Sequence, residues 1–248
     1  SINDVTNLTI EGKIGSFLHV LTAKEANYLQ ELALKSPLKI PVLIGIDAIH
    51  GNALVSGTTV YPSPIGLAST WDDTFLYSIG KQTAKEMRAT GSHWAFTPNI
   101  DILRDPRWGR VGETLGEDPF MVGNMGAAMI NGFQQDDFTG TQKVIACVKH
   151  LIGGGESING LNAAPADISL RTLREVHLPP YKKAIDAGPQ GGEFTKHFKA
   201  PDGKVYSISG GKGAKSGNFT HMASATKAPT GAEWEDIIVY AYNKINNK

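Results

Sequence analysis

Four short apolar runs recur along the first three quarters of the chain. They cover residues 14–21, 41–46, 94–98 and 144–148. Strands of a parallel sheet are buried on both faces, so such strands show continuous apolar runs instead of strict alternation. A segment with helical character follows each run, at residues 23–35, 73–89, 120–133 and 169–187. This alternation of strand and helix predicts an α/β fold built on a parallel sheet.

Charged and polar side chains cluster directly after the apolar runs. The largest cluster, residues 101–119, carries three arginines and five carboxylates around Trp108. Because α/β folds place their chemistry in the loops at the carboxyl ends of the strands, this loop is the first candidate for a functional site. A salt-bridged loop that clamps two helices would explain the same composition, so both interpretations stay open at this point.

Composition limits the class of protein. A chain of 248 residues that is 41% hydrophobic can bury a sizeable core and would suit one barrel or two smaller domains. The formal net charge is zero, whereas a nucleic-acid or membrane-surface partner needs a concentrated basic field. No stretch is apolar enough to span a bilayer, and we expect no signal peptide in this chain. Residues 1–13 are polar and are expected to form a loose entry segment.

Four motifs resemble glycoside hydrolase family 3. The sequences DPRWGR and GETLGEDP, at residues 105–110 and 112–119, are similar to the signature of that family. Upstream, residues 40–51 resemble the family's strand that ends in an aspartate gripping the terminal sugar. Downstream, residues 148–150 resemble its Lys-His pair, and residues 169–188 resemble the helix that follows. The four motifs stand in the order that the family shows.

The resemblance covers roughly residues 10–188 and implies the N-terminal, TIM-type (β/α)8-barrel domain of a β-glucosidase-like glycosidase. Such an enzyme is a retaining, exo-acting hydrolase that removes terminal β-D-glucosyl residues in carbohydrate catabolism. The four βα units would form the first half of the barrel. An open doubly wound sheet is the alternative, but no glycine-rich phosphate turn follows the first apolar run. The resemblance also implies a secreted or periplasmic location.

The resemblance assigns a sugar-binding role to Asp47, Arg110, Lys149 and His150. A carboxylate such as Asp47 can accept two charge-assisted hydrogen bonds from hydroxyls, although an aspartate after a strand can also cap a helix. The planar guanidinium of Arg110 would hold hydroxyls or a neighbouring carboxylate. Lys149 and His150 are adjacent at a strand end, so they point to opposite faces unless the strand has already bent into its loop.

The remaining charges of the signature loop are expected to form an ionic scaffold around Arg110. They are Arg104, Arg107, Glu113, Glu117 and Asp118. The other histidines of the chain are scattered without the spacing of metal ligands, so we expect no metal and no cofactor. The expected ligand is an oligosaccharide or a β-glucoside.

The catalytic groups of the family are missing from the sequence. A retaining glycosidase uses two carboxyl groups about 5 to 5.5 Å apart, a nucleophile and an acid/base. In the family the nucleophilic aspartate comes from a later barrel strand, and the acid/base comes from a second domain or a long loop. Glu156 lies in a flexible glycine-rich segment that could approach the pocket, but the resemblance gives it no catalytic role. Three hypotheses follow: a truncated or fused β-glycosidase, a non-catalytic sugar-binding module, and an inactive half-barrel scaffold or chimera.

The sequence changes character after residue 188. We therefore divide the chain into a partial family 3 barrel at residues 1–188 and an unrecognised tail at residues 189–248. Within this tail, residues 204–209 alternate as a strand would, and residues 231–244 predict an amphipathic helix. A half-barrel leaves its first and fourth strands unpaired, and such edges promote association. Because one tail strand cannot replace four barrel strands, we expect a homodimer formed through the half-barrel edges rather than a covered edge.

Overall fold

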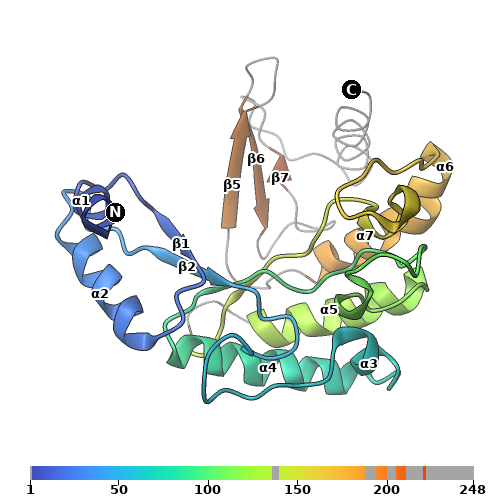
Figure 1. The fold of residues 1–248 in the computed structure, drawn as a ribbon, viewed down its shortest axis with the longest axis horizontal. Helices are drawn as coiled ribbons and strands as arrows, with labels where there is room; N and C mark the ends of the chain where they lie inside the picture. The colour runs from blue at the N-terminus through green and yellow to red at the C-terminus, as the bar shows by residue number, and fades with distance from the viewer. Residues whose placement is uncertain (1, 136–139, 188–193, 200–204, 211–219, 222–248) are drawn as a thin grey trace.

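A parallel sheet of four strands organises the part of the chain that precedes the tail. Its first two strands are labelled in Figure 1. The structure is a computed structural model that describes residues 2–135, 140–187, 194–199, 205–210 and 220–221. The strands are β1 (Ser16–Leu18), β2 (Leu43–Ile46), β3 (Trp94–Ala95) and β4 (Ile145–Ala146), and they lie in the order β1-β2-β3-β4. Successive βα units of a barrel give this sequential strand order. In a doubly wound sheet the order of the strands reverses at a switch point. The predicted α/β fold, with parallel βα units as in half of a (β/α)8 barrel, is therefore confirmed.

The register aligns the carboxyl ends of β2, β3 and β4, and β1 ends one residue earlier. Leu18 pairs with Gly45, Ile46 pairs with Ala95, and Ala95 pairs with Ala146. The segments that follow the four strands therefore leave the sheet at one edge. Polar residues that are far apart in the sequence meet at this edge.

Helices follow the strands along the chain. The longer ones are α2 (Ala23–Leu34), α4 (Asp73–Ala89), α5 (Pro119–Gln134) and the continuous stretch of α6 (Leu170–Thr172), the π-helical turn η4 (Leu173–His177) and α7 (Leu178–Asp186). Shorter ones are α1 (Ile2–Ile10), α3 (Pro64–Ala68) and the 3-10 turns η1 (Val111–Glu113), η2 (Gly154–Glu156) and η3 (Ile158–Gly160). Side chains of Thr22, Asp72, Asp118 and Ser169 accept hydrogen bonds from backbone N–H groups at the helix starts. Such N-caps satisfy donors that the helix itself leaves unpaired.

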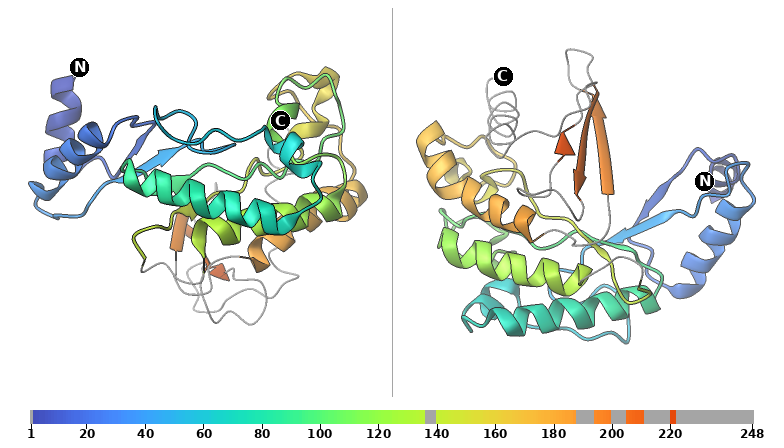
Figure 2. Two further views of the ribbon diagram at one scale, coloured as in Figure 1. Left: turned by 90° about the horizontal axis from the view of Figure 1, so that it is seen from below. Right: turned by 180° about the vertical axis from the view of Figure 1, so that it is seen from behind.

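Helices α4 and α5 lie side by side across one face of the molecule (Figure 2). Glycines permit their close approach, because a Cβ atom added at Gly132 would meet the Tyr77 carbonyl oxygen at 2.2 Å. A Cβ atom at Gly80 would lie 2.7 Å from the Met129 carbonyl oxygen. Buried apolar side chains from the two helices then join Ile46 of β2 in the main core. The two helices are therefore packed with the sheet in one hydrophobic core.

The expectation of a loose segment at residues 1–13 is wrong, because helix α1 occupies most of it. Thr9 is buried, and its hydroxyl donates a hydrogen bond to the Val5 carbonyl oxygen at 2.7 Å. The helix packs against α2. The sequence itself carries a helical signal here, because Ile2, Val5 and Leu8 recur at a spacing of three residues.

The tail contains a separate antiparallel sheet of β5 (Phe194–Lys199), β6 (Val205–Gly210) and β7 (Thr220–His221). The strand predicted at residues 204–209 is confirmed, but the prediction of a single tail strand is wrong. Among the described residues, β6 pairs with β5 and β7 and does not cover an edge of the parallel sheet. The helix predicted at residues 231–244 lies outside the described residues.

Candidate functional site

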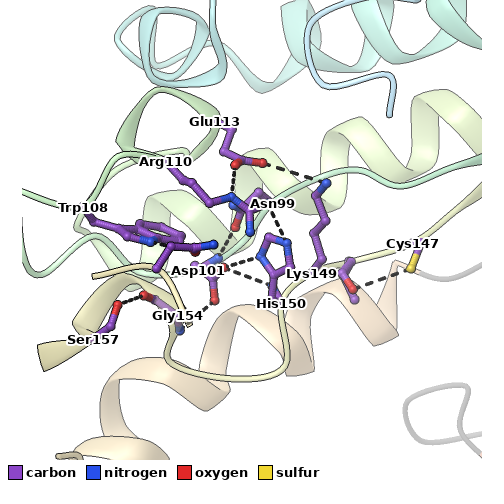
Figure 3. A network of polar contacts seen from close by, with 12 residues as sticks. Asn99, Asp101, Trp108, Arg110, Glu113, Cys147, Lys149, His150, Gly154 and Ser157 are labelled. Carbon is purple, nitrogen blue, oxygen red and sulfur yellow. Dashed lines mark hydrogen bonds and ion pairs between the residues drawn. The ribbon is translucent and has the colours of Figure 1, made fainter. Parts of the chain in front are cut away.

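Polar side chains from all four strand ends meet at the carboxyl edge of the sheet. His19 follows β1, Asp47 follows β2, Asp101 follows β3, and Lys149 and His150 follow β4. The loop after β3 adds Arg110 and Glu113, and Figure 3 shows the part of the group that surrounds Asp101. We call these seven residues the strand-end network. Its contacts join residues as far as 102 positions apart in the sequence.

Asp47 lies between a lysine and a histidine. Its Oδ1 atom accepts a hydrogen bond from Lys149 Nζ at 2.6 Å, and its Oδ2 atom lies 2.9 Å from His19 Nε2. Burial by itself raises the pKa of the Asp47 carboxyl, but the hydrogen bonds and charges of Lys149 and then of His19 outweigh it, and the pKa lies below its ordinary value. The Asp47 side chain remains 30% exposed, so its ionised carboxylate is accessible from solvent. Helix capping does not explain it, because the next helix, α3, begins at Pro64.

Arg110 enters the network from the loop after β3. Its Nε atom donates to Glu113, and its Nη2 atom lies 2.7 Å from His150 Nε2. The guanidinium also lies over the ring of Trp108, with Cζ 5.7 Å from the ring centroid, which is a cation–π geometry. Trp108 is buried, and its indole N–H donates to Asn162 Oδ1 at 3.1 Å. Glu113, His150 and Trp108 therefore all fix the orientation of this guanidinium.

Asp101 lies beneath His150 with a side chain that is 0% exposed. Its Oδ2 atom lies 2.8 Å from His150 Nδ1 and accepts from the His150 backbone N–H at 3.1 Å. Its Oδ1 atom accepts from the Gly154 N–H at 3.2 Å. The Asp101 N–H in turn donates to Asn99 Oδ1 at 2.9 Å. Buried carboxylates need such donors, because an unpaired buried charge is costly.

Glu113 connects the two halves of the network. One carboxylate oxygen accepts from Arg110, and the other lies 3.8 Å from Lys149 Nζ. This second oxygen is buried and accepts no hydrogen bond within the described part of the chain. Lys149 therefore stands between two carboxylates, those of Asp47 and Glu113. The charges alternate in sign along Asp47, Lys149, Glu113 and Arg110.

The four residues expected to bind sugar thus lie in one connected group. Asp47 contacts Lys149 directly, Arg110 contacts His150 directly, and Glu113 links the two pairs. Lys149 and His150 do not lie on opposite faces of a strand, because β4 ends at Ala146. The alternative, in which the chain has already left the strand, is the one observed.

The ionic scaffold expected around Arg110 is largely wrong. Of the five residues expected in it, only Glu113 contacts the Arg110 guanidinium within the described part of the chain. Arg107 pairs with Asp105 instead, with Nη2 and Oδ2 2.6 Å apart, and the Arg107 hydrogen bonds lower the pKa of the Asp105 carboxyl to about 2. Asp118 caps helix α5. Arg107 and Asp105 are close in sequence and pair with each other at the surface, so among the described residues neither contacts Arg110.

Glu156 belongs to a neighbouring group of contacts. Its Oε2 atom lies 2.7 Å from Nε2 of the buried His177 and 3.8 Å from Arg104 Nε. Burial lowers the pKa of His177 more than the Glu156 contact raises it. Glu156 also lines an open hollow of about 550 Å³, and none of the four expected sugar-binding residues lines this hollow. The described structure therefore holds Glu156 to His177 and Arg104 and not to the network.

Sequence reasoning missed His19 and Asp101 as members of the site. His19 lay inside the predicted first run at residues 14–21, but β1 ends at Leu18, so His19 is the first residue beyond the strand. Asp101 stands at the start of the signature loop, after the third run. Both could have been found as candidates by considering every polar residue in the segment that follows each strand. Their contacts across the sheet could not be read from spacing.

The described residues contain no group of three or more His, Cys, Asp or Glu side chains that could hold a metal ion. Among the same residues, no helix is both long enough and apolar enough to cross a membrane. The network itself presents carboxylates, a lysine ammonium, a guanidinium and imidazoles. Such groups bind neutral polar solutes through hydrogen bonds.

Comparison with known proteins gives a consistent result. Residues 3–191 match the model of the glycosyl hydrolase family 3 N-terminal domain. A β-xylosidase of Formosa agariphila is 37% identical over 198 residues, which are 76% of this chain and 27% of that protein. A periplasmic β-glucosidase of Salmonella typhimurium is 31% identical over 179 residues, 72% of this chain and 23% of that protein.

A solved structure is similar over the same region. The β-glucosidase from Listeria innocua in complex with glucose superposes with a TM-score of 0.67 at 36% identity, covering 72% of this chain and 25% of that one. The chain therefore spans about a quarter of the length of these relatives.

The substitution Lys149→Met should raise the pKa of the Asp47 carboxyl, because Lys149 is the main partner that lowers it. A carboxyl whose pKa is lower in the folded state than in the unfolded chain stabilises the fold at any pH above its unfolded-state pKa. This stabilisation is lost as the pH falls through the lowered, folded-state pKa. The variant should therefore lose less stability on acidification. A carboxyl ¹³C NMR titration, with Asp47 assigned from Asp47→Asn, measures the pKa directly. Lys81→Met, on the exposed face of α4, is the control, and an unchanged Asp47 titration in Lys149→Met would contradict the assigned pairing.

Proposed function

Because the chain belongs to glycosyl hydrolase family 3 through that family's N-terminal domain, we propose that it forms the sugar-binding part of a retaining, exo-acting β-glycosidase of the β-glucosidase type. The ligand would be a terminal β-D-glucosyl residue of an oligosaccharide or a β-glucoside. One observation carries the proposal: Asp47, Arg110, Lys149 and His150 lie in one connected network at the carboxyl edge of the sheet. Parallel α/β folds bind their ligands at this edge.

The contacts of the network support recognition of hydroxyl groups. A hydroxyl both donates and accepts a hydrogen bond, and Asp47 and Lys149 offer an acceptor and a donor whose polar atoms are 2.6 Å apart. Arg110 adds further donors with a fixed direction. Its side chain and that of Asp47 are each 30% exposed, so both can reach a ligand while their partners hold them in place.

Hydrolysis needs a nucleophile and an acid/base, and we propose that both come from outside residues 3–191. Two carboxyl groups about 5 to 5.5 Å apart would be required at the anomeric carbon. Glu156 is engaged by His177 and Arg104, which favours a structural role for it. The alternatives are a non-catalytic sugar-binding module and an inactive half-barrel scaffold or chimera. A scaffold would not require the four residues expected to bind sugar to lie in one network.

We propose an extracytoplasmic location, secreted or periplasmic, because the relative in Salmonella typhimurium is a periplasmic β-glucosidase. Oligosaccharide ligands fit such a compartment. The zero net charge of the chain gives no reason to propose a nucleic-acid or membrane-surface partner.

The isolated chain should bind glucose weakly, with a dissociation constant on the order of millimolar. Asp47→Ala should abolish this binding, because the acceptor that Lys149 orients is lost. Arg110→Lys should weaken binding, because an ammonium group cannot reproduce the guanidinium fork. Titration calorimetry or ligand-observed NMR measures both effects.

Asp105→Ala is the matched control, because it removes an aspartate of the same signature loop whose partner is the exposed Arg107. Circular dichroism confirms that each variant is folded. A folded wild-type chain without any response to glucose would end both sugar-based hypotheses for the isolated chain and would leave the scaffold.

Turnover of an aryl β-glucoside by the chain alone should be negligible, because loss of an activated nucleophile typically removes most of the rate enhancement. The assay compares wild type with Glu156→Gln after successive purification steps. Activity that persists through purification and disappears in Glu156→Gln would show that Glu156 is the nucleophile and that the proposed division of roles is wrong.

We further propose that two copies of the chain associate through the edges of the half-barrel. Among the described residues, β1 and β4 each pair with a strand on one side only, and Leu18 on β1 is 62% exposed. Unpaired, apolar strand edges favour association, and a two-fold axis would bring like edges together. Light scattering should therefore give the mass of a dimer. A monomer with a cooperative thermal transition would contradict the association.

A further inference from the structure

The buried carboxylate of Asp101 is an acceptor at both of its oxygen atoms. Oδ2 receives the His150 backbone N–H and faces His150 Nδ1, and Oδ1 receives the Gly154 N–H. The side chain is 0% exposed, so it does not itself reach a ligand. Its partner His150 is 37% exposed and contacts Arg110, another of the four residues expected to bind sugar.

The neighbours of His150 determine where its ring proton lies. A carboxylate oxygen only accepts, so the Nδ1 atom that faces Asp101 must carry the hydrogen. A guanidinium only donates, so the Nε2 atom, 2.7 Å from Arg110 Nη2, must accept. Figure 3 shows His150 beside Asp101 and Arg110. Both contacts are satisfied together only by a neutral imidazole with its proton on Nδ1.

We propose that Asp101 is a positioning residue: it fixes His150 as the Nδ1–H tautomer and thereby aims the Arg110 guanidinium into the sugar site. The bare Nε2 atom of this tautomer is the acceptor that holds Nη2, while Glu113 holds Nε. With the other tautomer, an N–H on Nε2 would face the Arg110 N–H, and the guanidinium would lose one of its two acceptors. The tautomer does not depend on sugar binding, but its importance for the ligand rests on the proposed function.

Two substitutions separate the acceptor role of Asp101 from its charge. Asp101→Ala removes every acceptor from His150 and from Gly154. Asp101→Asn keeps one acceptor oxygen, which satisfies two donors when it faces His150 and only one when it faces Gly154. The amide oxygen should therefore face His150, and the asparagine variant should keep the Nδ1–H tautomer at the expense of the Gly154 contact.

The sugar-free protein gives the decisive readout. Long-range ¹H–¹⁵N NMR of the imidazole, with His150 assigned from His150→Gln, distinguishes a protonated Nδ1 from a protonated Nε2. Wild type and Asp101→Asn should show the Nδ1–H tautomer, and Asp101→Ala should lose it. The Nη resonances of Arg110, assigned from Arg110→Lys, should be resolved in wild type and averaged by rotation in Asp101→Ala. A change in global packing alone would not move the tautomer in this selective way.

A glucose titration then tests the effect on the ligand. Asp101→Ala should weaken binding by roughly tenfold or more, as is typical when an outer partner that orients a metal-binding histidine is removed. Asp101→Asn should recover most of the affinity, and Asp105→Ala should bind as wild type does.

The outcomes separate this proposal from the proposed function. A wild-type His150 that carries its proton on Nε2, or on both nitrogens, overturns the proposal even if no variant folds. Unchanged glucose affinity in a folded Asp101→Ala also overturns it. Absence of glucose binding in wild type overturns the proposed function, and the tautomer and the Arg110 resonances still decide whether Asp101 positions the pair.

Discussion

The site depends on four parallel strands whose carboxyl ends lie on the same side of the sheet. Strands β2, β3 and β4 end in register and β1 ends one residue earlier, so the segments that follow the strands meet at one edge. Asp47 and Lys149 are 102 positions apart in the sequence, and their polar atoms are 2.6 Å apart in the fold. No local element could bring these side chains together. Helix α4 follows β2 and helix α5 follows β3. Gly80 and Gly132 allow these two helices to pack tightly against one another.

Alternation of charge makes this edge stable. Each carboxylate of the network contacts a cation or an N–H donor, so a charge that the fold removes from water is compensated. Burial divides the roles: Asp101 is covered and orients its partner, whereas Asp47 and Arg110 are partly exposed. A site of this kind is already ordered before a ligand arrives, which reduces the entropic cost of binding.

The sequence predicted the strands and the main helices, because apolar runs and helical periodicity are local signals. The four expected sugar-binding residues came from family motifs, and the structure places them together. Contacts between distant segments leave no local signal, so the roles of His19 and Asp101 were missed. The ionic scaffold was wrong for the opposite reason, because Arg107 pairs locally with Asp105, two positions away, and not with the site. Strand β5 was missed because Lys196 lies between Phe194 and Phe198 in the period of a strand.

A crystal structure of the chain with bound glucose tests the central claim, that the strand-end network is a sugar-binding half-site. The account predicts one hexose with hydroxyl oxygens within hydrogen-bond distance of Asp47, Lys149 and Arg110, and with His150 still held by Asp101. Glucose in the hollow beside Arg104 and Glu156, with no sugar at the network, would contradict it.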